Sequence, residues 1–107
     1  MSHRERIGSV ADFDTSGGVR VDVGEHRIAV FRVEGELYAI GDRCSHAEAS
    51  LAEGELFDFG VECPRHGSEF DLRSGEPHAL PATSPVPVYE IEVDGDAVFI
   101  IVDEEPQ

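Results

Sequence analysis

The sequence has no long apolar run and few basic residues, and each of these two shortages argues against a class of protein. Without about 18 consecutive apolar residues no transmembrane helix is expected. The charged start also lacks the apolar stretch of a secretory signal peptide, so we expect a cytoplasmic protein. Eight basic residues against 23 acidic ones give a net charge of −15, which argues against nucleic acid as a partner.

Short strand-like segments separated by turns run through most of the chain. Val19, Val21 and Val23 alternate with polar residues, as in a half-buried strand. Residues 28–33 are rich in β-branched and aromatic residues, and the turn at 34–36 joins them to a partner strand at 37–40. Residues 88–93 and 97–102 form a last hairpin around Asp94-Gly95-Asp96. A short first strand is expected at 7–10, followed by a loop at 12–18.

The middle of the chain predicts smaller elements. Residues 55–57 and 61–62 flank Asp58-Phe59-Gly60 and suggest a small hairpin that delivers Cys63. Residues 77–87 hold four of the six prolines and cannot form a central strand. No segment of useful length shows apolar residues at helical spacing. The sequence therefore predicts an all-β sandwich or barrel in a single domain of 107 residues.

Two groups of ring side chains receive simple structural expectations. Three histidines have no spaced partner and are expected to be exposed: His3, His26 and His78. Five aromatic residues are expected in the core: Phe57, Phe59, Phe70, Tyr89 and Phe99.

Both cysteines belong to short mixed pairs, Cys44-x-His46 and Cys63-x-x-His66, with 16 residues between them. Thiolate and imidazole are ligands suited to iron or zinc. A structural zinc site usually takes two cysteines from one knuckle, whereas here each knuckle carries one of each. A binuclear cluster explains this order, with the cysteines on one metal and the histidines on the other. A mononuclear zinc site through the same residues, a disulfide, or two buried cysteines remain as alternatives.

The pattern continues into Gly67-Ser68-x-Phe70-Asp71 and a proline-rich stretch at 80–89. In this form it resembles the Rieske [2Fe-2S] proteins, most closely the small soluble ferredoxins of dioxygenase systems. The resemblance implies an all-β fold, a Rieske-type antiparallel β-sandwich or barrel with an inserted cluster-binding subdomain at about 41–75. The whole chain, 1–107, would be a single Rieske domain that binds one [2Fe-2S] cluster.

The resemblance assigns seven cofactor-binding residues, the first four of them metal ligands: Cys44, His46, Cys63, His66, Gly67, Ser68 and Pro81. The two cysteines would hold the inner iron and the two histidines the outer one. Gly67 would let the backbone approach the cluster. Ser68 would donate a hydrogen bond to a bridging sulfide or only shape the turn, and Pro81 would lie on a loop that covers the cluster.

The resemblance implies a one-electron carrier and not an enzyme. It would take electrons from a flavin-dependent reductase and pass them to an oxygenase or another redox acceptor. The chain has no room for a separate catalytic domain or a second, mononuclear iron site. Two alternatives are an accessory protein of iron–sulfur cluster assembly, as in similar actinobacterial proteins, and a component like the small subunit of nitrite reductase. The acidic surface would serve solubility or dock basic redox partners.

Two departures from the high-potential members of this family predict a low reduction potential. Ala47, Glu48 and Arg65 stand near the ligands where those members have disulfide-bonded cysteines, and Phe70 replaces a tyrosine that donates a hydrogen bond to a ligand sulfur. Fewer hydrogen bonds stabilise the added electron less, so a potential of roughly −150 mV is expected. The histidine ligands should lose a proton more easily in the oxidised state, so reduction at alkaline pH should take up a proton.

Overall fold

A computed structural model describes residues 2–13, 17–43, 49–64, 69–77 and 85–103. Within these ranges the chain forms short strands and two 3-10 helices, η1 (Val10–Phe13) and η2 (Leu51–Glu53). The strands are β1 (Ser2–Ser9), β2 (Val19–Val23), β3 (His26–Val33), β4 (Glu36–Gly41), β5 (Glu55–Phe57), β6 (Gly60–Glu62), β7 (Glu69–Asp71), β8 (Val88–Asp94) and β9 (Ala97–Asp103). No helix in these ranges is long and apolar enough to span a bilayer.

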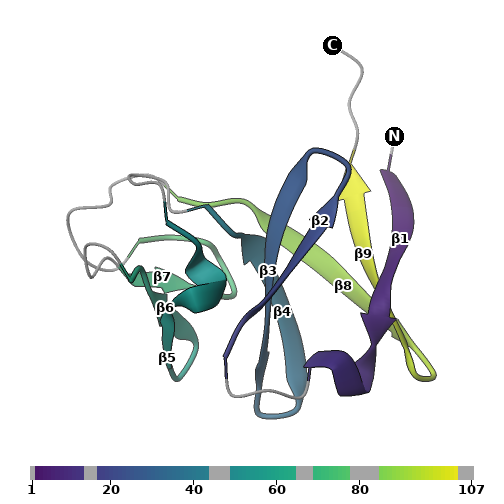
Figure 1. The fold of residues 1–107 in the computed structure, drawn as a ribbon, viewed down its shortest axis with the longest axis horizontal. Coiled ribbons are helices and arrows are strands. Elements are labelled where there is room, and N and C mark those ends of the chain that lie inside the picture. Colours follow the sequence, from purple (N-terminus) through teal and green to yellow (C-terminus); the bar gives the residue numbers. More distant parts are fainter. Residues whose placement is uncertain (1, 14–16, 44–48, 65–68, 78–84, 104–107) are drawn as a thin grey trace.

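Six strands form one antiparallel sheet in the order β1-β9-β8-β4-β3-β2 (Figure 1). The hairpins β2-β3, β3-β4 and β8-β9 are each closed by a turn of two residues, and the turns of the last two were predicted at 34–36 and 94–96. β4 and β8 are joined by only two residue pairs, Ala39 with Tyr89 and Ile40 with Val88. The long insertion between these two strands therefore begins and ends at neighbouring strands of the sheet.

The remaining three strands form a small antiparallel sheet in the order β5-β6-β7. Figure 1 shows this sheet on the side of β3 and β4 away from β1 and β9. It belongs to the insertion between β4 and β8, where the sequence predicted a subdomain at about 41–75. The all-β antiparallel fold with an insertion between strands is therefore confirmed, including the hairpin that leads into Cys63.

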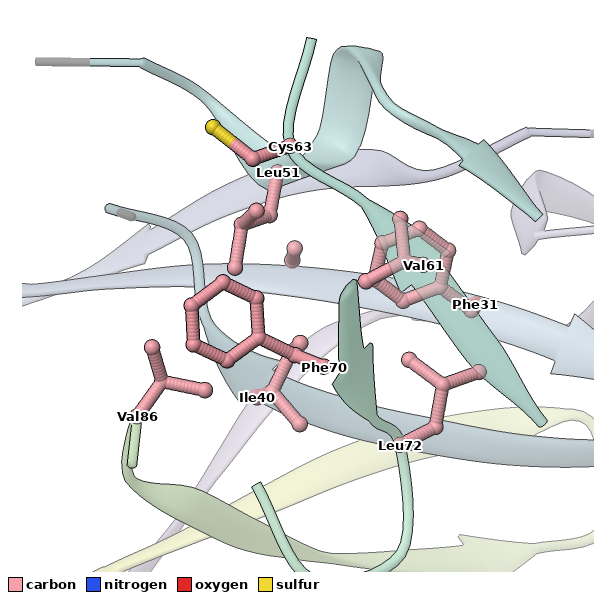
Figure 2. Packing of buried hydrophobic residues seen from close by; sticks show 9 residues of the cluster. Phe31, Ile40, Leu51, Val61, Cys63, Phe70, Leu72 and Val86 are labelled. Atoms are coloured by element: carbon pink, nitrogen blue, oxygen red, sulfur yellow. The ribbon is translucent and has the colours of Figure 1, made fainter. Parts of the chain in front are cut away.

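β3 separates two hydrophobic clusters, because successive side chains of a strand point to opposite faces. Ile28 and Val30 pack with β9 and Phe13 on one face. Ala29 and Phe31 pack on the other face, against the small sheet. A strand buried on both faces reads as a continuous apolar run, which is how residues 28–31 appear in the sequence. The second of these clusters is the one that contains Cys63 (Figure 2).

Several local expectations were wrong. The first strand begins at Ser2, not at Ile7. Val10, expected at the end of that strand, lies in a 3-10 helix that extends into the start of the expected loop. His26 is half-buried rather than exposed, and its Nδ1 lies 3.0 Å from the hydroxyl of Tyr89. The two rings meet edge-on at a centroid distance of 5.6 Å. Burial raises the pKa of Tyr89. His3 is exposed as expected, whereas His78 lies outside the described residues.

The aromatic core also differs from the expectation. Phe70 is fully buried, but Phe57 is 46% exposed. Phe59, Tyr89 and Phe99 are half-buried. The largest buried aromatic side chains besides Phe70 are Phe13 and Phe31, which the sequence did not single out.

Candidate metal centre

Cys63 is the predicted ligand that the structure describes. The other six predicted residues lie outside the described ranges: Cys44, His46, His66, Gly67, Ser68 and Pro81. Cys63 directly follows β6, is 1% exposed and is a free thiol. The disulfide alternative involves Cys44, which lies outside the described residues, and it stays untested.

The small sheet holds Cys63 in place from both sides. β6 pairs with β5 and β7, so that Val61 lies opposite both Leu56 and Phe70. Gly54 lets the start of β5 approach β6, because a Cβ there would lie 2.0 Å from the carbonyl oxygen of Glu62. In Figure 2 the sulfur of Cys63 lies at the edge of the cluster, pointing away from Phe31 and Leu72. The side chain of Cys63 is thus buried at the edge of the cluster, and the drawn side chains do not surround its sulfur.

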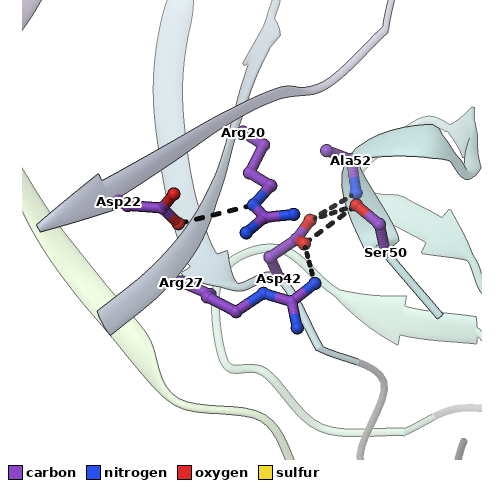
Figure 3. A network of polar contacts seen from close by, with 6 residues as sticks. All are labelled: Arg20, Asp22, Arg27, Asp42, Ser50 and Ala52. Atoms are coloured by element: carbon purple, nitrogen blue, oxygen red, sulfur yellow. Dashed lines mark hydrogen bonds and ion pairs between the residues drawn. The ribbon is translucent and has the colours of Figure 1, made fainter. Parts of the chain in front are cut away.

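The first predicted ligand segment, 44–48, is flanked by a buried polar network centred on Asp42 (Figure 3). The Asp42 side chain is fully buried, and its carboxylate oxygens accept hydrogen bonds from Ser50 Oγ at 2.7 and 2.8 Å. The backbone N–H of Ala52 donates to the same carboxylate at 2.9 Å. An isolated bridge pairs Arg43 with Ser50. The residues just before and just after the segment are therefore held next to each other.

The charge of Asp42 is compensated by Arg27, whose Nη2 lies 3.4 Å from the carboxylate. Buried carboxylates need such pairing because desolvation disfavours the charged form. Arg27 is bound to the network in a second way, since its backbone carbonyl accepts a hydrogen bond of 2.9 Å from the Asp42 N–H. The Nε of Arg27 is buried and has no hydrogen-bond partner among the described residues, whereas its Nη2 faces the Asp42 carboxylate.

The second ligand segment, 65–68, is followed by a turn that Asp71 organises. Its carboxylate accepts hydrogen bonds from the backbone N–H groups of Arg73 at 2.7 Å and Ser74 at 3.2 Å. Burial alone would raise the pKa of Asp71, but the hydrogen bonds from the side chain and backbone of Arg73 and from Ser74 outweigh it and lower this pKa. The Arg73 guanidinium also lies 4.4 Å from the ring centre of Phe59, which ties the turn to the β5-β6 hairpin.

Residues 78–84, which belong to the proline-rich segment 77–87, are flanked by described residues that are joined to other parts of the chain. The N–H of Val86 donates to the carbonyl of Gly75 at 2.9 Å, and a bridge pairs Pro77 with Phe70. Gly75 has a φ of 75°, and a Cβ there would lie 2.1 Å from the Val86 carbonyl oxygen. Glycine is required at this position both for the left-handed backbone and for the close approach of the two chains.

The three segments that carry the other predicted residues are flanked by residues of a single hydrophobic cluster. The described residues that flank them pack in the same apolar cluster: Ala49 and Leu51 after the first, Cys63 before and Phe70 after the second, and Val86 after the third. Figure 2 shows most of these side chains around Phe70. Segments far apart in the sequence therefore start or end beside the one described thiol.

The donor chemistry present at this place fits an iron–sulfur cluster. Cys63 is a soft donor with a free thiol, and it lies in an apolar cluster at the end of β6. Among the described residues no three histidine, cysteine or acidic side chains gather to form another metal site.

Sequence reasoning missed the role of Asp42 and Ser50. Both were visible only as polar residues next to the first ligand segment. A usable signal existed, because an acidic residue directly follows an apolar strand and directly precedes the ligand-bearing loop.

Comparison with known proteins gives a consistent family. Residues 3–90 match the family model described as Rieske [2Fe-2S] domain. The 3-phenylpropionate/cinnamic acid dioxygenase ferredoxin subunit of Escherichia coli strain K12 is 47% identical over 92 residues, which cover 85% of this chain and 86% of that protein.

Two solved structures have closely similar folds. The ferredoxin of carbazole 1,9a-dioxygenase from Nocardioides aromaticivorans is 34% identical with a TM-score of 0.86, and the match covers 91% of this chain and 95% of that one. A structure described as a complex of reduced oxygenase and oxidised ferredoxin in carbazole 1,9a-dioxygenase gives the same identity, 34%, and the same TM-score, 0.86, over 97% of each chain.

Proposed function

Because this chain belongs to the Rieske [2Fe-2S] family, we propose that Cys44, His46, Cys63 and His66 hold its one cluster. The strongest support comes from Cys63, whose free and buried thiol lies where the flanks of the three candidate segments meet. When bound, such a cluster supplies a one-electron redox couple. The protein is accordingly an electron-transfer component and not itself a catalyst.

The residues of the chain would make two contributions to this task. Cys63, directly after β6, would offer one thiolate ligand, and Cys44 would offer the second one. Leu51, Phe70 and Val86 exclude water beside Cys63, which lowers the local dielectric and strengthens every hydrogen bond to sulfur.

Three further assignments concern the surroundings of the cluster. Gly67 would allow the backbone to come close, and the Ser68 hydroxyl would donate a hydrogen bond to a bridging sulfide. Pro81 would lie over the cluster, in the segment whose flanking residues include Gly75 and Val86, which share a hydrogen bond.

For the partners, we propose an oxygenase of the ring-hydroxylating type as acceptor and a flavin-dependent reductase as donor, in the cytoplasm. The relatives named above are ferredoxins of dioxygenase systems, and one is described in complex with its oxygenase. They do not favour the alternatives of cluster assembly or nitrite reduction. The net charge of −15 would accelerate association with basic patches on either partner.

The test of the cluster assignment is iron and acid-labile sulfide analysis of anaerobically purified protein. About two irons and two sulfides per chain are expected for one [2Fe-2S] cluster. Cys63→Ser and His66→Ala should lose the cluster, whereas His26→Ala should keep it. A colourless protein, or one that binds a single zinc through the same residues, would contradict the proposed function.

The test of the partner assignment is reconstitution with purified components. The protein should be reduced by a flavin-dependent ferredoxin reductase and reoxidised by a ring-hydroxylating oxygenase with its aromatic substrate. The rate at low protein concentration should fall as salt is added, because screening removes the attraction between charged surfaces. A holoprotein that no such oxygenase reoxidises would refute the partner assignment while leaving the cluster assignment intact.

A further inference from the structure

We propose that Asp42 is a positioning residue that fixes the two ends of the segment bearing Cys44 and His46. This inference rests on the proposed ligand assignment and adds a residue that does not itself bind the cluster. Asp42 lies two residues before Cys44, and its side chain is fully buried. Its partners lie on the far side of the segment, at Ser50 and Ala52.

The backbone and the carboxylate of Asp42 both make hydrogen bonds in this network. Its carboxylate accepts from the Ser50 hydroxyl and from the Ala52 N–H, and its carbonyl accepts from the Leu51 N–H at 2.6 Å. Its own N–H donates to the Arg27 carbonyl at 2.9 Å. Asp42 therefore ties the start of the segment both to its end and to β3, the strand buried on both faces.

A carboxylate suits this role better than any neutral side chain of the same shape. One oxygen, Oδ1, accepts from both Ser50 and Ala52, while the other, Oδ2, faces Ser50 and the Arg27 guanidinium. Asparagine has one acceptor oxygen and one NH₂ group, so one of its two ends would present a donor to another donor. The same change would leave the Arg27 guanidinium without its buried counter-charge.

The consequence for the site is preorganisation of the first ligand pair. Holding both ends of a loop reduces the conformational freedom that must be lost when its residues bind a metal. Groups outside the ligand set that orient the ligands also tune metal affinity, typically by about 10- to 100-fold. Loss of the Asp42 contacts should therefore loosen cluster binding and widen the range of ligand geometries, even though no ligand has been removed.

The chain offers a matched control in Asp22. Asp22 also accepts from an arginine at 3.4 Å, but this pair lies on the surface, where the Asp22 side chain is 58% exposed. Asp42→Asn and Asp22→Asn change the net charge by the same amount and each lose one arginine partner (Figure 3). Only the first substitution disturbs the ends of the ligand segment, so the pair separates positioning from a general charge effect.

The experiment compares cluster-loaded wild type, Asp42→Asn and Asp22→Asn. The first readout is the rate at which an iron chelator bleaches the visible absorbance, and the second is the width of the EPR lines of the reduced protein. Asp42→Asn should bleach about tenfold faster than wild type and give broadened lines. Asp22→Asn should match wild type in both readouts.

Three results would overturn the inference. The first is an Asp42→Asn variant that behaves like Asp22→Asn. The second is faster bleaching with unchanged EPR lines, which would indicate a general loss of stability. If Asp42→Asn does not accumulate with a cluster, Ser50→Ala decides, because it removes one donor and keeps the carboxylate. It should bleach about threefold faster with broadened lines, and wild-type behaviour would be the third contrary result.

Failure of the proposed function looks different from failure of this inference. If the ligand assignment is wrong, the wild-type protein itself will lack two irons and the EPR signal of a [2Fe-2S] cluster. If the wild type carries the cluster and Asp42→Asn is unaffected, only the positioning role of Asp42 fails.

Discussion

Gly75→Ala should destabilise the protein more than any other glycine substitution in a turn with the same backbone conformation. Gly75 has a φ of 75°, where an L-residue costs about 1–2 kcal/mol. Its new Cβ would also lie 2.1 Å from the Val86 carbonyl oxygen and 3.0 Å from Val88 Cγ2. The backbone at Val86 must then move, which breaks the 2.9 Å hydrogen bond from its N–H to Gly75.

The magnitude follows from two separate terms. The backbone strain contributes about 1 kcal/mol after allowing for the reduced freedom of alanine in the unfolded chain. Loss of the hydrogen bond to a buried partner adds about 1–3 kcal/mol. We therefore expect a total near 3 kcal/mol. Gly35→Ala is the matched control, because Gly35 has a φ of 83° and nothing lies within 4 Å of its Cβ position. It should cost about 1 kcal/mol, the strain alone.

The assay is anaerobic urea unfolding of the cluster-loaded proteins, followed by far-UV circular dichroism and visible absorbance together. The difference in unfolding free energy is taken from the midpoints with a shared slope. Gly75→Ala should also bleach earlier than its sheet unfolds, because the residues that flank the proline-rich segment are displaced. Equal shifts for Gly75→Ala and Gly35→Ala would refute the close packing of Gly75 against Val86.

Other substitutions and conditions test separate parts of the account. Phe70→Ala should lower the unfolding free energy by about 3–5 kcal/mol and Phe57→Ala by about 1 kcal/mol, because only Phe70 is fully buried; equal losses would contradict the burial of Phe70. The lowered pKa of Asp71 stabilises the fold above the ordinary value of 3.8, so the advantage of wild type over Asp71→Asn should be full above about pH 5 and shrink as pH falls further, and a pH-independent difference would refute this. A redox titration should give a midpoint of roughly −150 mV, and a clearly positive value would contradict the reasoning from Phe70. Above neutral pH this midpoint should fall as protons are taken up on reduction, whereas a flat profile would count against histidine ligation by His46 and His66.

The strands were predictable where local signals agreed. The β8-β9 hairpin combines alternating apolar residues with the turn Gly95-Asp96, and the β2-β3 hairpin does the same with Gly24 and Glu25. The turn type and the period of two are both local properties, so they can be read from a few residues. The same holds for the β5-β6 hairpin, although its strands are only three residues long.

The burial of individual aromatic residues was not predictable in the same way. Phe57 and Phe31 are both strand residues, yet Phe31 faces the small sheet and Phe57 faces solvent. Which face of a strand is covered depends on how the second sheet packs, and this is set by contacts between distant residues. His26 was misjudged for the same reason, because its partner Tyr89 lies 63 residues away.

In the candidate site, too, local features could be predicted from the sequence and contacts between distant residues could not. The ligand set follows from spacing and residue type, which the sequence displays directly. The supporting network could not be predicted, because Arg27, Asp42 and Ser50 come together only through the register of β3 and β4 and the position of η2. Likewise, the need for glycine at position 75 arises from its contact with Val86 across the proline-rich segment.

The most direct test of the histidine- and cysteine-ligated cluster is pulsed EPR of the reduced protein after labelling histidine with ¹⁵N. We predict couplings from two coordinated histidine nitrogens, one of which disappears in His66→Ala if that variant retains any cluster. A [2Fe-2S] signal without histidine nitrogen couplings, or no iron–sulfur signal at all, would contradict the account.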